Sequence, residues 1–194
     1  MTQTIITKPT VAIQAAKSEL THEEIINRSG KKKRFGFASA SQRAAMVTFY
    51  YPYVFYEWKV TVPRFLFKDG KALIRIGVNG LTNVAAQTEI WPDYETVQAE
   101  TENCLPFRFT AESVDNECRR ALENYVYKLM RPLKPPIYDL NRMERIYLPY
   151  HVFLEQSFGK KTLMVTEALT GVTAEARKMK ELHSWLESMA YRNN

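Results

Sequence analysis

The feature that most constrains the fold of this chain is an approximate internal repeat. Tyr-Tyr-Pro-Tyr at residues 50–53 reappears as Tyr-Leu-Pro-Tyr at residues 147–150, and each copy opens a run rich in Val, Phe and Tyr. Further on, Gly-Leu-Thr-Asn-Val-Ala-Ala at residues 80–86 is matched by Ala-Leu-Thr-Gly-Val-Thr-Ala at residues 168–174. Because the landmarks recur in the same order, we expect residues 50–85 and 147–174 to trace one backbone shape twice.

The two Leu-Thr segments differ at one informative position, where Asn83 in the first corresponds to Gly171 in the second. Asn and Gly are the residue types that most readily adopt the left-handed backbone conformation. The exchange therefore predicts a turn with positive φ at both positions.

Between these landmarks each copy has the pattern of a β-hairpin. In the first, Trp58, Val60 and Val62 alternate with polar residues, Asp69-Gly70 marks a tight turn, and apolar residues alternate again over residues 72–78. In the second, a shorter loop at residues 157–160 leads to a return strand over residues 161–166. When the two copies are aligned on their Leu-Thr turns, apolar residues of the first return strand correspond to polar residues of the second. The second copy is therefore expected to need a bulge or a shifted register.

Three helices are expected. A capping box formed by Thr21 and Glu24 predicts a short helix that ends near residues 29–30. Thr110 is the expected N-cap of a second helix that ends before Pro132, with an apolar stripe of Val114, Cys118, Ala121, Leu122, Tyr125, Val126 and Leu129. A third closes the chain with Ala176, Met179, Leu182, Leu186 and Met189 on one face. The linker at residues 131–140 contains three prolines and is expected to be neither regular helix nor central strand.

These elements predict an α+β fold of two tandem helix-plus-β-hairpin units with an antiparallel sheet and a C-terminal helix. The first unit would comprise residues 1–103 and the second residues 104–194, as two domains or as one compact domain.

The order of helix, hairpin and Leu-Thr-Gly-type turn resembles the PepSY family, whose strand ends in a turn written roughly as Val-Asp-x-x-Thr-Gly. The matching stretches are residues 78–83 and 166–171; both lack the Asp, and only the second keeps the Gly, Gly171. The resemblance implies an α+β architecture and a binding or inhibitory role. It carries over no functional residue.

Composition narrows the class of protein. The net charge of +6 favours contact with anionic surfaces, and no window approaches the length of an apolar membrane span. The N-terminal ten residues lack the pattern of a signal peptide, so a cytoplasmic protein is expected. Cys104 and Cys118 have no partners at ligand-like spacing, which favours free thiols over a zinc site, and neither a metal nor a cofactor is expected.

The basic segment at residues 31–43 is the most suggestive charged feature. Its cations could neutralise phosphates while its two Phe rings stack on single-stranded bases. The alternative interpretation is a solvated loop whose cations keep a sheet edge soluble. The candidate nucleic-acid-binding residues are Lys31, Lys32, Lys33, Arg34, Phe35, Phe37 and Arg43.

The run Phe49 to Trp58 holds seven aromatic residues in ten positions. Such a strand is either buried on both faces or exposes one adhesive face. Core packing is the first interpretation. The second gives candidate anchors for a protein partner, namely Tyr51, Tyr53, Tyr56 and Trp58.

Signatures of catalysis are missing from the sequence. The three histidines are far apart, and there is no phosphate-binding loop or nucleophile elbow. We therefore expect a non-catalytic protein-binding or assembly module with another protein as partner. The alternative is a nucleic-acid-binding protein that uses the segment from Lys31 to Arg43.

Overall fold

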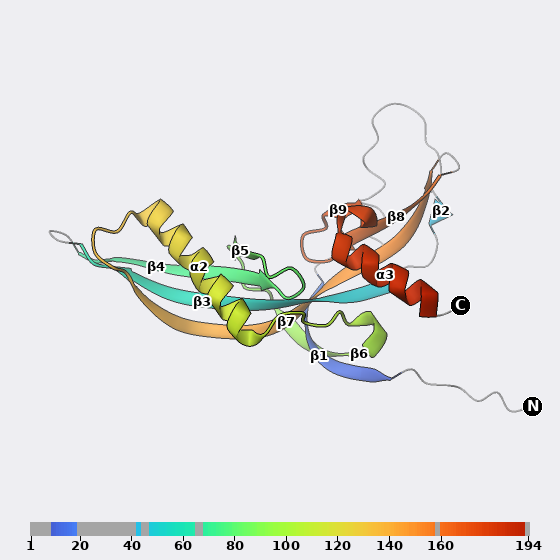
Figure 1. Ribbon diagram of the computed structural model, residues 1–194, viewed down its shortest axis with the longest axis horizontal. Coiled ribbons are helices and arrows are strands. Elements are labelled where there is room, and N and C mark those ends of the chain that lie inside the picture. Colours follow the sequence, from blue (N-terminus) through green and yellow to red (C-terminus); the bar gives the residue numbers. More distant parts are fainter. Residues whose placement is uncertain (1–8, 19–41, 44–46, 65–67, 158–159, 193–194) are drawn as a thin grey trace, which may run out of the picture. The chain divides into compact units, whose positions relative to one another are not determined.

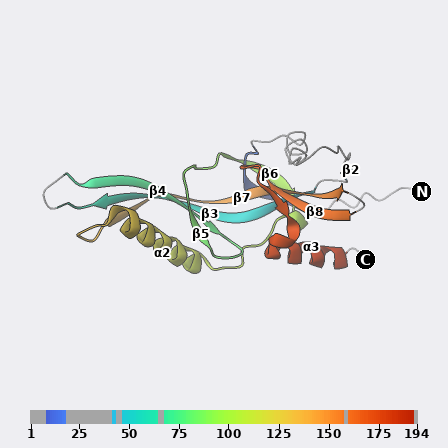
Figure 2. The ribbon, with the colours of Figure 1, turned by 90° about the horizontal axis from the view of Figure 1, so that it is seen from above.

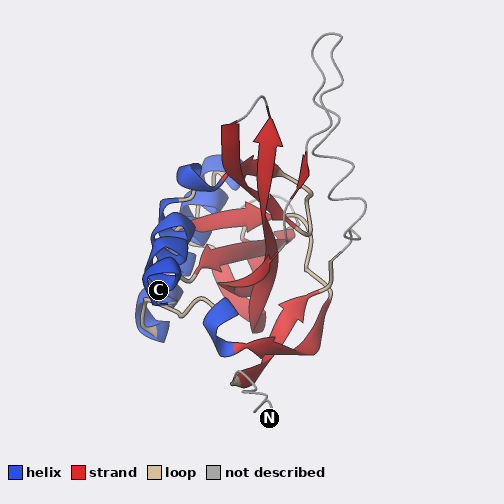
Figure 3. Ribbon diagram, turned by 90° about the vertical axis from the view of Figure 1, so that its right-hand side faces the viewer, coloured by secondary structure: helices blue, strands red, loops and turns tan. Residues whose placement is uncertain are grey.

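The computed structural model describes residues 9–18, 42–43, 47–64, 68–157 and 160–192 (Figure 1). Of the described residues, 52% lie in strands of a large mixed sheet and 24% in helices; Figure 3 shows the strands in red and the helices in blue. The prediction of two tandem helix-plus-hairpin units is therefore wrong. The described residues form a strand-dominated fold with two α-helices.

The chain divides into two compact units, and each is assembled from separated segments. Unit 1 comprises residues 1–51, 94–105 and 147–194, and unit 2 comprises residues 52–93 and 106–146. The predicted domain boundary between residues 103 and 104 stays a prediction.

Unit 2 is built on a hairpin. Its strands β3 (Val47–Val62) and β4 (Gly70–Asn79) pair antiparallel from Tyr53↔Asn79 to Val62↔Gly70, and β5 (Ala85–Thr88) pairs with the other edge of β4. Helix α2 (Ala111–Met130) and the first part of strand β7 (Ile137–Ser157) complete the unit. Strands β3 and β7 both continue into unit 1.

Unit 1 contains the remaining strands. Strand β1 (Thr10–Ala16) pairs antiparallel with β6 (Tyr94–Glu100) and parallel with β7 at Ala15↔Tyr147. Strand β7 also pairs with the short β2 (Gln42–Arg43) and with β8 (Lys160–Glu167), which pairs with β9 (Thr173–Glu175). Two short 3-10 turns, Thr101–Asn103 and Ala176–Lys178, precede Cys104 and helix α3 (Lys180–Arg192).

Helix α2 covers one face of β3 and β4 in unit 2 (Figures 1 and 2). Period-two alternation turns the even-numbered residues of both strands toward the helix, since successive side chains of a strand point to opposite faces. The apolar stripe of the helix packs on them. The buried residues of this core are Val54, Tyr56, Trp58, Val60, Val62, Ile74, Ile76, Val78, Val114, Cys118, Leu122 and Val126.

The predicted bounds of α2 are confirmed. The hydroxyl of Thr110 accepts a hydrogen bond from the Ser113 N–H as N-cap, and Arg131 ends the helix in the left-handed conformation with φ 44°, just before Pro132. One member of the predicted stripe differs, because Leu129 is 58% exposed. The third helix is also confirmed, although it begins at Lys180, so Ala176 lies in the preceding 3-10 turn and Met179 caps that turn.

The two Leu-Thr turns share one pattern of backbone hydrogen bonds. In unit 2 the N–H groups of residues 79, 80 and 83 donate to the carbonyls of residues 84, 52 and 79, over 3.0, 2.8 and 2.9 Å. In unit 1 the N–H groups of residues 167, 168 and 171 donate to the carbonyls of residues 172, 149 and 167, over 3.0, 3.0 and 2.9 Å. The predicted positive φ is confirmed, at 53° for Asn83 and 67° for Gly171.

Both hairpins keep the same register relative to these turns. Pairing runs from Tyr53↔Asn79 in the first and from Tyr150↔Glu167 in the second, and the ladders continue without interruption over nine and seven further pairs. The expected bulge or register shift is therefore wrong. Val165 and Thr166 are both buried, so both faces of the second return strand are covered near the turn, which removes the conflict between the two apolar patterns.

The fold-class prediction failed because it underestimated the strands. Strand β7 begins at Ile137, directly after the last proline of the linker, so residues 137–140 are strand rather than irregular linker. The pairing of β1 with β6 joins residues 78 to 90 positions apart, which no local pattern shows. The helix predicted over residues 21–29 lies outside the described residues.

Candidate functional site

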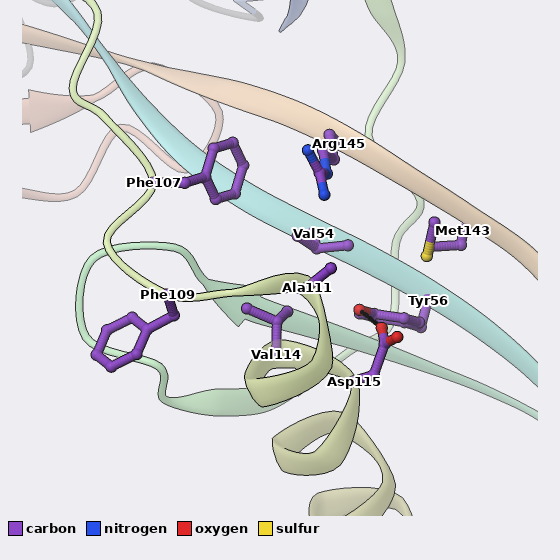
Figure 4. A pocket seen from close by; sticks show the side chains of 9 residues that line it. All are labelled: Val54, Tyr56, Phe107, Phe109, Ala111, Val114, Asp115, Met143 and Arg145. Carbon is purple, nitrogen blue, oxygen red and sulfur yellow. Dashed lines mark hydrogen bonds between the residues drawn. The ribbon is translucent and has the colours of Figure 1, made fainter.

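A cavity of about 90 Å³ lies in unit 2 beside the N-terminal end of α2 (Figure 4). Its walls come from β3, from the segment that precedes α2, from the first turns of α2, and from β7. The lining residues are Val54, Tyr56, Phe107, Phe109, Ala111, Val114, Asp115, Met143 and Arg145.

The segment that carries Phe107 and Phe109 is held by the first Leu-Thr turn. The N–H of Arg108 donates to the carbonyl of Gly80 over 2.9 Å. Gly80 also leaves room for the ring of Phe107, because a Cβ at residue 80 would lie 2.6 Å from that ring and 3.0 Å from the Pro52 carbonyl oxygen. The same turn that closes the hairpin thus positions one wall of the cavity.

A buried tyrosine and a carboxylate form the polar part of the cavity. The hydroxyl of Tyr56 donates to Asp115 Oδ1 over 2.5 Å, and the two side chains point toward each other in Figure 4. Burial, with the hydrogen bond to Asp115, raises the pKa of Tyr56 far above its ordinary value. Tyr56 is therefore a protonated hydrogen-bond donor at neutral pH, and it is not a base.

The rim of the cavity is apolar and accessible. Phe109 is 38% exposed and Met143 is 47% exposed. The exposed guanidinium of Arg145 lies 5.5 Å from the centre of the Phe107 ring, which is a cation-π distance. Aromatic residues, Met and Arg are the types enriched in protein interfaces, so this rim has the composition of a contact surface.

Neither cysteine of the chain is set up as a nucleophile. Cys118 is fully buried, Trp58 Nε1 donates to its sulfur over 3.4 Å, and burial raises the pKa of its thiol to about 12. Burial also raises the pKa of the Cys104 thiol. Both are free thiols, as the sequence predicted. Within the described residues, no group of three or more His, Cys, Asp or Glu side chains is arranged to hold a metal ion.

The structure places the predicted partner-binding residues mostly inside the units. Tyr51, Tyr56 and Trp58 are 2%, 3% and 4% exposed. In unit 1 the rings of Tyr51 and Tyr150 lie 5.3 Å apart. Tyr53 is half-buried, and its ring stacks against Phe55 at 5.9 Å. These four rings are largely covered by the chain itself, and only Tyr56 lines the cavity; their role as anchors stays a prediction.

The predicted nucleic-acid-binding residues from Lys31 to Phe37 lie outside the described residues. The backbone of Arg43 pairs with Glu155 in β2 and β7, and its side chain is not described. This alternative function stays a prediction from the sequence.

Sequence reasoning missed Phe107, Phe109, Met143 and Arg145. The two Phe residues stand at positions three and one before the Thr110 cap, so the signal that predicted the helix start also marked their location. Nothing in the sequence indicated that residues 143 and 145 of β7 would reach the same place.

Comparisons of the chain with protein-family models, with curated proteins and with solved structures gave no match. In the part of the chain that the structure describes, no helix is both long and apolar enough to cross a membrane.

Proposed function

We propose that the chain is a non-catalytic protein-binding or assembly module, in which the cavity of unit 2 receives one apolar side chain from a partner segment. The observation that carries the proposal is the accessible rim of Phe109, Met143 and Arg145 around a small cavity. Binding energy in protein interfaces is concentrated where a few such residues form a pocket for one anchor.

The size of the cavity sets the size of the anchor. A volume of about 90 Å³ corresponds to roughly three waters at ~30 Å³ each, which is room for one aliphatic side chain and too little for a cofactor. Ligand pockets for drug-sized molecules are several times larger, at roughly 300–1,000 Å³. The cavity therefore favours a peptide anchor over a metabolite.

The charge at the rim sets the expected neighbours of that anchor. Arg145 is exposed and presents a planar cation beside the cavity, so an acidic residue next to the anchor would be attracted to it. The protonated Tyr56 and the Asp115 carboxylate are already paired with each other. A partner segment with an aliphatic residue flanked by Asp or Glu fits this arrangement.

The test is selection of peptides from a random library displayed on phage, with the purified full chain as bait. Selected peptides should share an aliphatic residue beside an acidic one. Phe109→Ser and Arg145→Ser should each weaken their binding at least about tenfold, the ~1.4 kcal/mol or more of a contact at the centre of an interface. Ile90→Ser is the matched control, since Ile90 is 71% exposed and does not line the cavity.

Two results would overturn the proposal. One is selection that enriches no common peptide. The other is binding that Phe109→Ser leaves at the affinity of the Ile90→Ser control, because the cavity would then play no part in it.

A further inference from the structure

One end of unit 2 combines exposed cations with exposed apolar side chains. This end, called here the basic end, consists of residues 62–64, 68–73 and 127–140 at the far ends of β3, β4 and α2 and the start of β7. Figures 1 and 2 both show these ends together, and Val62, Ala72, Met130 and Tyr138 pack in one core. The basic end is therefore one surface of a single unit.

Cations outnumber anions at the basic end. It holds six cations against two anions, Asp69 and Asp139, whereas the net charge of the whole chain is +6. The six cationic side chains are all exposed. They are Arg64, Lys68, Lys71, Lys128, Arg131 and Lys134.

Large apolar side chains stand among these cations. Leu133 is 90% exposed, the most exposed large apolar side chain among the described residues. The others at this end that are about half exposed are Leu73, Tyr127, Leu129, Ile137 and Leu140. Single exposed apolar residues are ordinary, but a cluster of them on one surface marks an interaction site.

The backbone holds this apolar cluster in the open. Arg131 ends α2 in the left-handed conformation, and Pro132, Pro135 and Pro136 flank Leu133 and Lys134. Each proline fixes its own φ and restricts the residue before it, so the connection loses little conformational entropy when it binds. Leu133 is thus exposed to solvent on a backbone segment whose conformation the prolines restrict.

We propose that the basic end of unit 2 docks on the surface of an anionic lipid bilayer, with Leu133 and its apolar neighbours in the interfacial layer and the cations against the lipid headgroups. In this mode of attachment the protein lies on the surface of the bilayer and does not span it. The anionic lipid headgroups attract the cations, and the boundary of the acyl chains buries the aliphatic side chains away from water. Tyr127 is of the type that is enriched at the membrane–water interface.

The composition of the basic end favours a bilayer over the two other anionic partners. Nucleic acid would bind the cations through its phosphates and aromatic rings through base stacking. It has no apolar surface that would bury aliphatic side chains such as Leu129, Leu133 and Ile137. An acidic protein would need pockets for its own anchors, and no residue of this end lines the cavity described above. A bilayer needs no pocket, because it adapts to a protruding side chain.

The experiment is co-sedimentation of the full chain with large vesicles at 0.1 M NaCl. Vesicles of 30% phosphatidylserine in phosphatidylcholine should bind the chain, and pure phosphatidylcholine vesicles should bind it at least tenfold more weakly. Lys128→Ser and Lys134→Ser should each reduce partitioning about fivefold. Leu133→Ser should reduce it about tenfold through lost apolar contact.

Matched controls separate this surface from general basicity. Lys178→Ser and Val172→Ser change an exposed cation and an exposed valine of unit 1, and both should leave partitioning unchanged. All these side chains are exposed, so circular dichroism should show folded variants.

Four outcomes would overturn the proposal. The first is absence of binding to the phosphatidylserine vesicles. The second is binding that Leu133→Ser leaves intact, which would indicate charge attraction alone. The third is binding that disappears when residues 31–34 are changed to Ser but not when residues 128 and 134 are, which would assign it to the basic segment near the N-terminus. Tighter binding of a single-stranded oligonucleotide, weakened by the lysine variants and not by Leu133→Ser, would instead assign the basic end to nucleic acid.

Discussion

Two turns of the molecule share one backbone hydrogen-bond pattern but differ in the side-chain hydrogen bonds that support it. One is at residues 79–84 of unit 2 and the other at residues 167–172 of unit 1. In unit 2, Asn79 Oδ1 accepts from the N–H groups of Leu81 and Thr82 over 2.8 and 3.0 Å. In unit 1 the equivalent residue, Glu167, instead accepts from the Thr170 hydroxyl over 2.7 Å. The shape of the turn therefore depends on its backbone pattern, and different polar side chains can support it.

The comparison also explains why two separate sequence motifs recur together. The carbonyls of Pro52 and Pro149, in the Tyr-x-Pro-Tyr segments, accept from the N–H groups of Gly80 and Ala168 in the turns. Proline lacks an N–H and cannot donate to a ladder, but its carbonyl is free to accept. Each Pro-containing segment is thus the anchor of the turn that follows it in sequence.

The largest difference between the copies should appear at residues 80 and 168. Gly80→Ala would place a methyl group 2.6 Å from the Phe107 ring and 3.0 Å from the Pro52 carbonyl oxygen, so we expect a loss of about 2–3 kcal/mol of unfolding free energy from overpacking. Ala168 holds the same methyl group fully buried, and Ala168→Gly should cost only about 1 kcal/mol. Urea denaturation of both variants measures the two values.

Equal losses for these two variants would contradict the argument, because the crowding by Phe107 exists in unit 2 alone. Gly80→Ala should also weaken peptide binding at the cavity, since the added methyl displaces a ring that lines it.

The next largest effect concerns the residue pair just before each turn. Val78 pairs with Ala85 in unit 2, whereas Thr166 pairs with Thr173 in unit 1, and those two hydroxyls hydrogen-bond over 2.7 Å. Val78→Thr should cost about 2 kcal/mol, because it buries a hydroxyl opposite a residue that cannot bond to it. Denaturation midpoints at constant m-value measure the change.

The reverse exchange should be tolerated if both hydroxyls are removed. Thr166→Val alone is expected to cost about 1 kcal/mol, and the double variant Thr166→Val/Thr173→Ala should return to within about 0.5 kcal/mol of the parent, because no buried polar group is left unpaired. A double variant that is worse than the single one would show that the two positions do not act as a pair.

A smaller effect, visible only in acid, should distinguish the middles of the two hairpins. Glu57 faces Arg75 across the strands of unit 2, with Arg75 Nε 2.7 Å from Glu57 Oε2, whereas Leu154 faces Leu163 in unit 1. The hydrogen bond from Arg75 lowers the pKa of Glu57 below its ordinary value of 4.5. The stabilisation is therefore complete above pH 4.5 and is lost as the pH falls through the lowered pKa.

The double variant Glu57→Leu/Arg75→Leu copies the leucine pair of unit 1 into unit 2. Its stability should fall less steeply than that of the parent below pH 4.5, and thermal unfolding from pH 7 to pH 3 measures both curves. Glu89→Leu, at an exposed position, is the control and should keep the slope of the parent. If the stability curves of parent and double variant ran parallel, Glu57 would not contribute to the loss of stability in acid.

Local signals in the sequence predicted several local features of the structure correctly. Thr110 and Pro132 bracket α2 correctly, alternation predicts the buried residues Ile74 and Ile76, and the Asn83–Gly171 exchange predicts two residues with positive φ. Each rests on hydrogen bonds or packing within a few residues, or within one hairpin.

The sheet and the cavity could not be predicted in the same way. The pairing of Ile13 with Val97 and the meeting of Phe107 with Arg145 join segments that lie far apart in the sequence. The periodicity of a strand shows which side chains share a face, but it does not show which strand lies beside it. The local patterns therefore predict both hairpin turns, but they do not predict the sheet to which the hairpins belong.

The smallest effect is expected at the two residues with positive φ. Asn83 costs some strain at φ 53°, and its Nδ2 donates to the Ser113 Oγ over 3.0 Å. Asn83→Gly relieves the strain and loses the hydrogen bond, two terms of about 1 kcal/mol each, so the net change should be within about 0.5 kcal/mol. Gly171→Asn should be equally mild, because Asn tolerates this conformation.

Gly171→Val is the contrasting variant, since a β-branched residue at φ 67° should lose about 1–2 kcal/mol. Chemical denaturation of the three variants compares them directly. If Gly171→Asn lost as much as Gly171→Val, the glycine would be required for close packing rather than for its conformation. The correspondence between the two turns would then end at this residue, although their hydrogen bonds agree.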